Sequence, residues 1–338
     1  MNGETTMTVT SPPGLPDTVS PLRMTPGRWL ALAVAVPVAL ALIGWTGFSL
    51  VSATAKGSYP FSYAVPVRDG QVSLSVNAGN ITLRQGPDGS IAKLTGTVQY
   101  GLFRPDLSEF TTPTGANLGL DCAGVSALNG TCGATAVLDL PGRTAVTLRS
   151  NGGDIAASGS ASGASLWAGG GNITASNLTG AIQLDTEGGD LTASGLTGTL
   201  QIGTEGGNIT AGGWAATGTA RVDTGGGDLN LDGLTGDLQL AAEGGNVDAS
   251  GVSSAVSSIQ SGGGDVTLAY TQAPQNLQIS ADGGNVTVIL PPGGTRYDIS
   301  TPDTSGGNVS YPAALADPAS HRTITVDSGG GDITVSQG

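Results

Sequence analysis

The fold is decided by residues 179–214, where TGAIQLDTEGGDLTASGL (179–196) is followed directly by TGTLQIGTEGGNITAGGW (197–214). The two copies share a Thr-Gly start, a Glu-Gly-Gly turn and aliphatic residues on both sides of that turn. A fixed internal period of this kind indicates a repeat architecture, in which each unit buries its apolar face against its neighbours.

The same turn recurs along residues 150–338 as a Gly-Gly pair followed by Asp or Asn. We call these Asp and Asn residues the turn ladder: Asp154, Asn172, Asp190, Asn208, Asp228, Asn246, Asp265, Asn285, Asn308 and Asp332. Successive members are 18, 18, 18, 20, 18, 19, 20, 23 and 24 residues apart. An outlying copy of the turn ends at Asn80.

Apolar residues flank each turn with the period of two that is typical of β-strands. Aliphatic residues directly follow the ladder, at Ile155, Ile173, Leu191, Ile209, Leu229, Val247, Val266, Val286, Val309 and Ile333. A second aliphatic set lies six residues before the ladder, with Pro302 as its exception. Polar residues fill the interleaved positions, including Gln183, Gln201, Gln239 and Gln278.

Two all-β architectures fit this pattern. In a β-solenoid each unit is one rung and equivalent residues stack in columns, whereas in an antiparallel meander each Gly-Gly pair is a hairpin turn. The matching of residues from one unit to the next favours the solenoid. We therefore expect a Gly-rich β-solenoid of about ten rungs of 18–24 residues, preceded by one transmembrane helix.

The turn ladder alternates between Asp and Asn over its first eight members. Stacked carboxylates on neighbouring rungs would repel each other by about 1 kcal/mol in a watery setting. An intervening Asn doubles the spacing of the charges, and its amide can donate a hydrogen bond to a carboxylate. We therefore expect the alternation to relieve repulsion along the stack.

A 23-residue segment without charge, residues 29–51, is long enough to span a bilayer. Arg23 and Arg28 precede it, so the positive-inside rule places residues 1–28, a tail expected to be disordered, in the cytoplasm. Residues 52–66 are then a linker, and 67–338 an exported β-repeat domain anchored in the cell membrane. The alternative is a signal peptide cleaved near Ala53-Thr54-Ala55.

Residues 84–145 are expected to be an insertion that separates the Asn80 turn from the regular repeats of 146–338. Cys122 and Cys132, the chain's two cysteines, lie in this insertion. In an exported protein such a pair predicts a disulfide that closes a small loop. A metal or redox pair is the alternative, but the spacing matches neither a CxxC motif nor a zinc site.

The charge distribution argues against nucleic-acid binding. The net charge of the chain is −14, and residues 150–338 carry 18 acidic residues against Arg221, Arg296 and Arg322. Nucleic-acid binding requires clustered Lys and Arg. The 57 glycines have no three-residue period, so collagen is excluded as well.

The Gly-Gly-Asp/Asn-aliphatic units resemble a bacterial "putative adhesin" family, a β-strand-repeat domain of unknown function. The resemblance also includes Leu138-Asp139-Leu140-Pro141-Gly142 followed by 146–155, echoed at 288–309, and it covers most of 67–338. It implies exposure at the cell envelope and no established enzymatic activity. The expected function is therefore adhesion or contact with an envelope protein or polysaccharide. The alternative is an accessory or sensory role in an envelope-stress system.

No cofactor or catalytic residue is expected. His321 is the only histidine, and the carboxylates recur singly rather than in a cleft. Asp185, Glu187 and Asp190 are weak candidates for a calcium site, because the chain lacks the nonapeptide spacing of calcium-binding repeats. Trp167 falls at an outward strand position, and Trp214 at a second turn is expected to fill the core.

The C-terminal end of the repeats is expected to be uncapped. The chain ends at Gly338, three residues after Val335, with no segment that looks like a cap. Repeat proteins need capped ends to avoid stacking on copies of themselves. Self-association through this end is therefore an expectation of the sequence.

Overall fold

The structure is a computed structural model that describes residues 38, 57–67, 69–87, 89, 91–101, 104–112, 115–121, 132–159, 162–302, 304 and 306–338. The chain divides into two units, residues 1–54 and 55–338. Val38, the one described residue of the first unit, is helical and exposed. No helix among the described residues is long and apolar enough to cross a bilayer. The predicted span 29–51 and the tail 1–28 lie almost wholly outside these residues and stay predictions.

Part of the predicted linker is instead a strand. Residues Gly57–Pro66 form β1, which pairs antiparallel with β4 (Ile91–Tyr100) along its whole length. Alternate side chains of β1 face the core, where Phe61 and Val65 are buried. The linker prediction 52–66 is therefore wrong for residues 57–66, because this segment buries its apolar side chains against the sheet.

Each repeat contributes one strand before its Gly-Gly turn and one strand after it. We call the two resulting sets of paired strands the pre-turn stack and the post-turn stack. The regular pre-turn strands are β8 (Ala145–Ser150), β10 (Gly163–Ala168), β12 (Thr179–Thr186), β14 (Thr197–Thr204), β18 (Val256–Ser261) and β20 (Asn276–Ala281).

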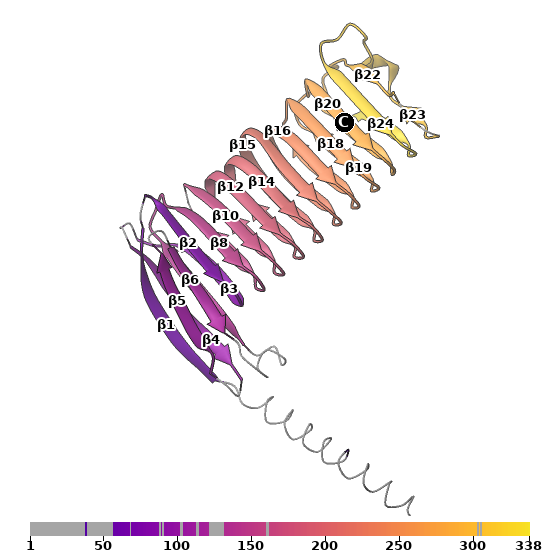
Figure 1. Ribbon diagram of the computed structural model, residues 1–338. Helices are drawn as coiled ribbons and strands as arrows, with labels where there is room; N and C mark the ends of the chain where they lie inside the picture. The colour runs from indigo at the N-terminus through magenta and orange to yellow at the C-terminus, as the bar shows by residue number, and fades with distance from the viewer. Residues whose placement is uncertain are drawn as a thin grey trace, which may run out of the picture. The chain divides into compact units, whose positions relative to one another are not determined.

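The post-turn strands lie on the opposite side of the core. They are β9 (Ile155–Ser158), β11 (Ile173–Ser176), β13 (Leu191–Ser194), β17 (Val247–Val252), β19 (Val266–Tyr270) and β21 (Val286–Leu290). Two longer strands, β15 (Ile209–Thr224) and β16 (Leu229–Ala242), begin in the post-turn stack and end in the pre-turn stack. Figure 1 shows the successive rungs side by side along the 55–338 unit.

Successive rungs pair in parallel and in register, as in a solenoid. Leu166 pairs with Leu148 on one side and with Leu184 on the other. Ile173 likewise lies between Ile155 and Leu191 in the post-turn stack. The antiparallel meander is therefore excluded for the regular repeats, because a Gly-Gly hairpin would pair the two strands of one unit with each other.

Two columns of stacked aliphatic side chains form the core. In the pre-turn column every residue is at most 1% exposed: Leu74, Leu148, Leu166, Leu184, Ile202, Val222, Leu240, Ile259, Ile279 and Val326. The post-turn column from Ile81 and Ile155 through Ile333 is equally buried, except for Val309. The sequence pattern therefore predicted the core correctly except at its last outer rung.

The second glycine of each turn is required by the close approach of the rungs. A Cβ atom added at Gly207 would lie 2.0 Å from the carbonyl oxygen of Gly189 in the neighbouring rung. Gly189 stands in the same relation to Gly171, at 2.1 Å. No side chain fits in such a gap, so the turn keeps glycine at this position in successive rungs.

The C-terminal rungs do not follow chain order. β24 (Thr323–Ser328) pairs with both β20 and β22 (Asp298–Ser300), and β25 (Ile333–Gln337) pairs with both β21 and β23 (Val309–Ser310). The last rung of the chain therefore lies between two earlier ones, as the arrangement of β20, β24 and β22 in Figure 1 also shows.

Residues 291–322 consequently form an outer cap that the sequence analysis missed. The cap contains β22, β23 and the 3-10 turn η1 (Ala313–Leu315), and its side chains Tyr297 and Leu315 are buried. Val309, predicted as a core residue, is 37% exposed because it lies on this outermost rung. The expectation of an uncapped C-terminal end is therefore wrong.

The predicted insertion 84–145 extends both stacks at the other end. β2 (Gln71–Val76) lies between β8 and β6 (Gly115–Asp121), and β3 (Gly79–Gln85) lies between β9 and β7 (Gly133–Leu140). Antiparallel strands then complete this end, with β5 (Asp106–Thr112) on β6 and β4 on β7. The described strands of this segment are thus part of the sheet rather than an interruption of it.

Candidate binding surface

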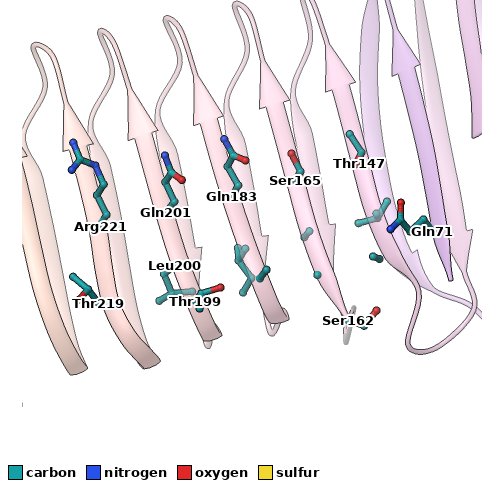
Figure 2. Close-up of a pocket in the computed structure, with 16 residues that line it drawn as sticks. Gln71, Thr147, Ser162, Ser165, Gln183, Thr199, Leu200, Gln201, Thr219 and Arg221 are labelled. Carbon is teal, nitrogen blue, oxygen red and sulfur yellow. The ribbon is translucent and has the colours of Figure 1, made fainter. Parts of the chain in front are cut away.

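The outer face of the pre-turn stack carries a column of polar side chains. Strand register aligns Thr147, Ser165, Gln183, Gln201, Arg221 and Gln239 across six neighbouring strands. Figure 2 shows the first five of these side chains pointing away from the core in one row. The aligned Gln residues that the sequence predicted as outward-facing are all exposed.

This column borders a groove of about 580 Å³ that crosses β2, β8, β10, β12, β14 and β15. The floor of the groove lies below the polar column because the strands begin with small side chains. Gly163, Ala181 and Thr199 are among these residues. Its far end is set by β15, where the register shifts between Ala215 and Thr219. That shift accommodates the 20-residue step between Asn208 and Asp228, so an irregular repeat limits the groove.

Ion pairing and hydrogen bonds orient the polar side chains beside the groove. The Arg221 Nε donates to Asp223 Oδ2 at 2.7 Å, and its Nη1 donates to Gln239 Oε1 at 3.3 Å. The Gln183 Nε2 donates to Asp185 Oδ2 at 2.8 Å. Desolvation raises the pKa of the Asp185 carboxyl, while the Gln183 hydrogen bond opposes this and the Asp223 charge adds to it.

The two tryptophans that the sequence singled out have different surroundings. Trp167 lies on the outer face of β10 between Arg149 and Asp185, two residues from the groove residue Ser165, and it is half-buried. Trp214 is 2% exposed, as predicted for a residue that fills the core. Among the described residues its indole Nε1 is one of four buried side-chain polar atoms without a hydrogen-bond partner.

The turn ladder forms a continuous chain of hydrogen bonds along the stack. The side chains of Asn80 and of each ladder residue except the outermost, Asn308, accept through Oδ1 the backbone N–H of the ladder residue on the next rung, at 2.7 to 3.1 Å. Four Asn amides also donate to the Oδ1 of the preceding Asp at 3.1 to 3.3 Å: Asn208, Asn246, Asn285 and Asn308. Asp and Asn both supply the required oxygen, but only Asn supplies the extra donor.

In spatial order the ladder alternates without a break. Its sequence is Asn80, Asp154, Asn172, Asp190, Asn208, Asp228, Asn246, Asp265, Asn285, Asp332 and Asn308. The chain order has an Asn–Asn step from Asn285 to Asn308. Asp332 fills that step, because the last rung is placed between the two.

Buried hydroxyl groups tie the turns together beneath the ladder. Thr204 Oγ1 donates to the carbonyl oxygen of Gly189 on the neighbouring rung and accepts the N–H of Gly207 in its own turn, both at 3.1 Å. Thr186 and Thr224 make the same two contacts. The small residues that the sequence showed four positions before the ladder therefore satisfy turn groups that the sheet leaves unpaired.

The weak calcium candidates do not come together. Asp185 is on the outer face of β12 and bonded to Gln183, whereas Asp190 accepts hydrogen bonds from Asn208 within the ladder. Glu187 is exposed in the turn between them. Within the described ranges, no three His, Cys, Asp or Glu residues are grouped so that they could hold a metal ion.

The predicted disulfide lies at the edge of what the structure describes. No described cysteine is a free thiol, and Cys132 is half-buried directly before β7. Cys122 falls outside the described residues. The pairing of Cys122 with Cys132 therefore stays a prediction.

The Gln column was predictable from the sequence, whereas the groove beside it and the Arg221–Asp223 pair were not predicted. Two signals were available in the sequence. The 20-residue step marks where the register shifts, and small residues at successive strand starts mark the floor. The depth of the groove depends on how neighbouring rungs align, which only the tertiary structure provides.

Comparison with known proteins assigns the repeat region to a family. The Toastrack DUF4097 family matches residues 64–336. No curated protein matches the chain. The family resemblance predicted from the Gly-Gly units is thereby confirmed.

Solved structures of low similarity include two proteins described as a "putative adhesin" and one as a "putative cell adhesion protein". The Bacteroides fragilis adhesin is 15% identical with a TM-score of 0.33, covering 82% of this chain and 97% of its own. The Parabacteroides merdae adhesin is 13% identical with a TM-score of 0.35, covering 82% and 96%. The Clostridium sporogenes protein is 11% identical with a TM-score of 0.18, covering 83% and 100%.

Proposed function

This chain belongs to the Toastrack DUF4097 family, and from that premise we propose that it is a non-enzymatic module of the cell surface. In this proposal residues 29–51 anchor the chain in the cell membrane, with the N-terminus in the cytoplasm. The β-repeat unit is then extracytoplasmic and makes adhesive or structural contacts with other envelope components.

The observation that carries the proposal is the in-register row of polar side chains across the outer face of the pre-turn stack. Gln183, Gln201 and Arg221 occupy equivalent positions on successive strands and point away from the core. A face of this kind presents polar side chains at a regular spacing of about 4.8 Å. Such a periodic surface is suited to contacting an extended partner, whereas catalysis requires different groups converging on one reacting atom.

Attachment of whole cells tests the proposal. The full-length chain is expressed in a non-adherent bacterial host, and attachment to envelope-coated surfaces is compared with that of cells expressing a variant with Gln183→Glu and Gln201→Glu. We expect the wild-type chain to increase attachment and the variant to lose most of the gain, because the added charges change the face without touching the core. A variant with Gln278→Glu, on the same column but outside the groove, is the matched control.

Protease treatment of intact cells checks the orientation in the same experiment. The proposal requires the repeat unit to be accessible from outside and residues 1–28 to be protected. No gain in attachment despite a surface-exposed repeat unit would contradict the adhesive function. A repeat unit protected in intact cells and in cells with a permeabilised outer layer would contradict the topology.

A further inference from the structure

We propose that the groove over β8, β10, β12, β14 and β15 binds a neutral, hydroxyl-rich polysaccharide chain that lies across the rungs. This inference rests on the proposed function and names the chemical class of its partner. Three features of the groove carry it: its open and elongated form, its repeated amide and hydroxyl side chains, and its lack of net charge.

The form of the groove suits an extended ligand. Its lining comes from six strands in succession, and it includes the floor positions Gly163, Ala181 and Thr199 as well as the polar row beside them. Compact metabolites are held in cavities that bury most of the ligand surface. A groove that runs over several rungs instead accommodates successive units of a chain molecule.

The polar lining can form hydrogen bonds with hydroxyl groups at regular intervals. Gln183 and Gln201 place identical amides on adjacent strands, about 4.8 Å apart. Each amide offers two donor hydrogens and an acceptor oxygen. Within the part of the chain that the structure describes, the Gln201 side chain makes no hydrogen bond to protein, so its full capacity faces the groove. Ser165 adds a hydroxyl in the same row. Thr199 and Thr219 add hydroxyls two residues earlier on β14 and β15.

The electrostatics favour a neutral polymer. Among the described residues that line the groove, Arg221 is the one that is charged, and its guanidinium is paired with Asp223. The surrounding repeats are strongly acidic, with 18 acidic residues against three Arg from residue 150 onward. An anionic polymer would meet this field without a compensating cluster of cations. A neutral glycan avoids that repulsion and uses the amides and hydroxyls directly.

Trp167 provides an aromatic surface next to the polar row. It lies on the same face of β10 as Ser165 and remains partly exposed. Amphipathic aromatic side chains offer both an apolar face and a polar edge. A sugar ring that extends beyond the groove toward the Gly-Gly turn would therefore contact this indole.

The test measures binding of the full-length chain, in detergent micelles, to neutral and anionic hexasaccharides. The probes are cellohexaose, chitohexaose and hexagalacturonate. Isothermal titration calorimetry measures the binding of each probe. We expect at least one neutral hexasaccharide to bind with an affinity that is the same at low and high salt, and hexagalacturonate to bind more weakly. The double variant Gln183→Ala with Gln201→Ala should lower affinity about tenfold, since two hydrogen bonds are lost.

Three further variants give the test its controls. Gln278→Ala removes an exposed amide from the same column outside the groove and should leave affinity unchanged. Trp167→Ala should weaken binding, whereas Trp167→Phe should retain part of it. Unchanged melting temperatures establish that each variant is folded.

The inference is overturned if neither neutral hexasaccharide binds, if hexagalacturonate binds more tightly than both, or if Gln278→Ala weakens binding as much as the groove variant does. The cell-attachment experiment separates this failure from failure of the proposed function. Attachment that persists in Gln183→Ala/Gln201→Ala cells would leave an adhesive protein with another partner. Absence of attachment by wild-type cells would remove the proposed function itself.

Discussion

The regular rungs of residues 146–290 and the C-terminal segment 291–338 carry the same repeat pattern but stack by different rules. In the regular region each unit pairs with the units before and after it in the chain. In the C-terminal segment the last unit, β24 and β25, is placed between two earlier ones. Nonetheless Asp and Asn alternate in space through both regions.

This comparison shows what the alternation responds to. If the alternation resulted only from duplication of a two-repeat unit, Asp and Asn would alternate in chain order. The changed order of the C-terminal rungs would then interrupt the alternation in space. Instead the spatial neighbours Asn285, Asp332 and Asn308 restore it. The alternation therefore follows contacts between neighbouring turns, and charge separation together with the hydrogen bonds of the Asn amides stays our hypothesis for its origin.

The largest expected effect concerns the order of the rungs themselves. Cysteines at Ser280→Cys and Asp327→Cys, which are paired across β20 and β24, should form a disulfide because adjacent strands lie within its reach. The pair Gln278→Cys and Ser300→Cys should not, because both residues pair with Thr325 from opposite sides. Gel mobility under non-reducing conditions gives the readout. Efficient crosslinking of the second pair alone would mean that the rungs follow chain order.

Core truncation sharpens the difference between a covered and an uncovered rung. Ile209 is fully buried in the regular region, so Ile209→Ala should lower the free energy of unfolding by about 3 kcal/mol or more. Val309 holds the equivalent position in the cap but is 37% exposed, so Val309→Ala should change it by about 0.5 kcal/mol or less. Urea denaturation measures both. Equal losses would show that the cap is covered in solution.

The two glycines of one turn form a matched pair. A Cβ atom at Gly189 would lie 2.1 Å from the Gly171 carbonyl oxygen, so Gly189→Ala should destabilise the protein by about 2 kcal/mol. A Cβ atom at Gly188 has no atom within 4 Å, so Gly188→Ala should stay within about 0.5 kcal/mol of wild type. Thermal unfolding followed by circular dichroism compares them. A tolerated Gly189→Ala would contradict the close stacking of the turns.

The smallest expected effect tests the alternation. Asn208→Asp would place three carboxylates in succession with Asp190 and Asp228, and remove the amide donor to Asp190. It should cost about 1 kcal/mol at low salt, and less at high salt because exposed charges are screened. Asn276→Asp, an exposed position outside the ladder between Val256 and Thr323, is the control. An equal melting temperature for both variants at low salt would argue against repulsion as the reason for the pattern.

Much of the fold was predictable from particular residues. The aliphatic positions at Ile173, Leu191 and Ile209 predicted stacked strands, and they are all fully buried in one column. The outward Gln column was predicted in the same way. These predictions succeed because the same residue pattern recurs in every repeat. The alternation of apolar and polar residues within one strand therefore agrees with the residue types at equivalent positions of the neighbouring strands.

Three features at the two ends could not be predicted, for a common reason. Residues 57–66 are a strand rather than a linker, β6 and β7 extend the two stacks, and β22 and β23 lie in the outer cap. Each depends on pairing with a strand that is not the next repeat along the chain. Local periodicity contains no information on which of several similar edges such a strand will pair with.

The sequence by itself determined the rung: two short strands, a Gly-Gly turn, an inward aliphatic column and an outward polar one. These follow from short-range periodicity and from the steric need for glycine at a close approach. Only the tertiary structure decided the order in which the end rungs stack and the groove that results where a 20-residue step shifts the register of β15. Both are set by contacts between distant parts of the chain. Several strand edges have similar residue patterns, and packing against the neighbouring strands decides which edge a given strand pairs with.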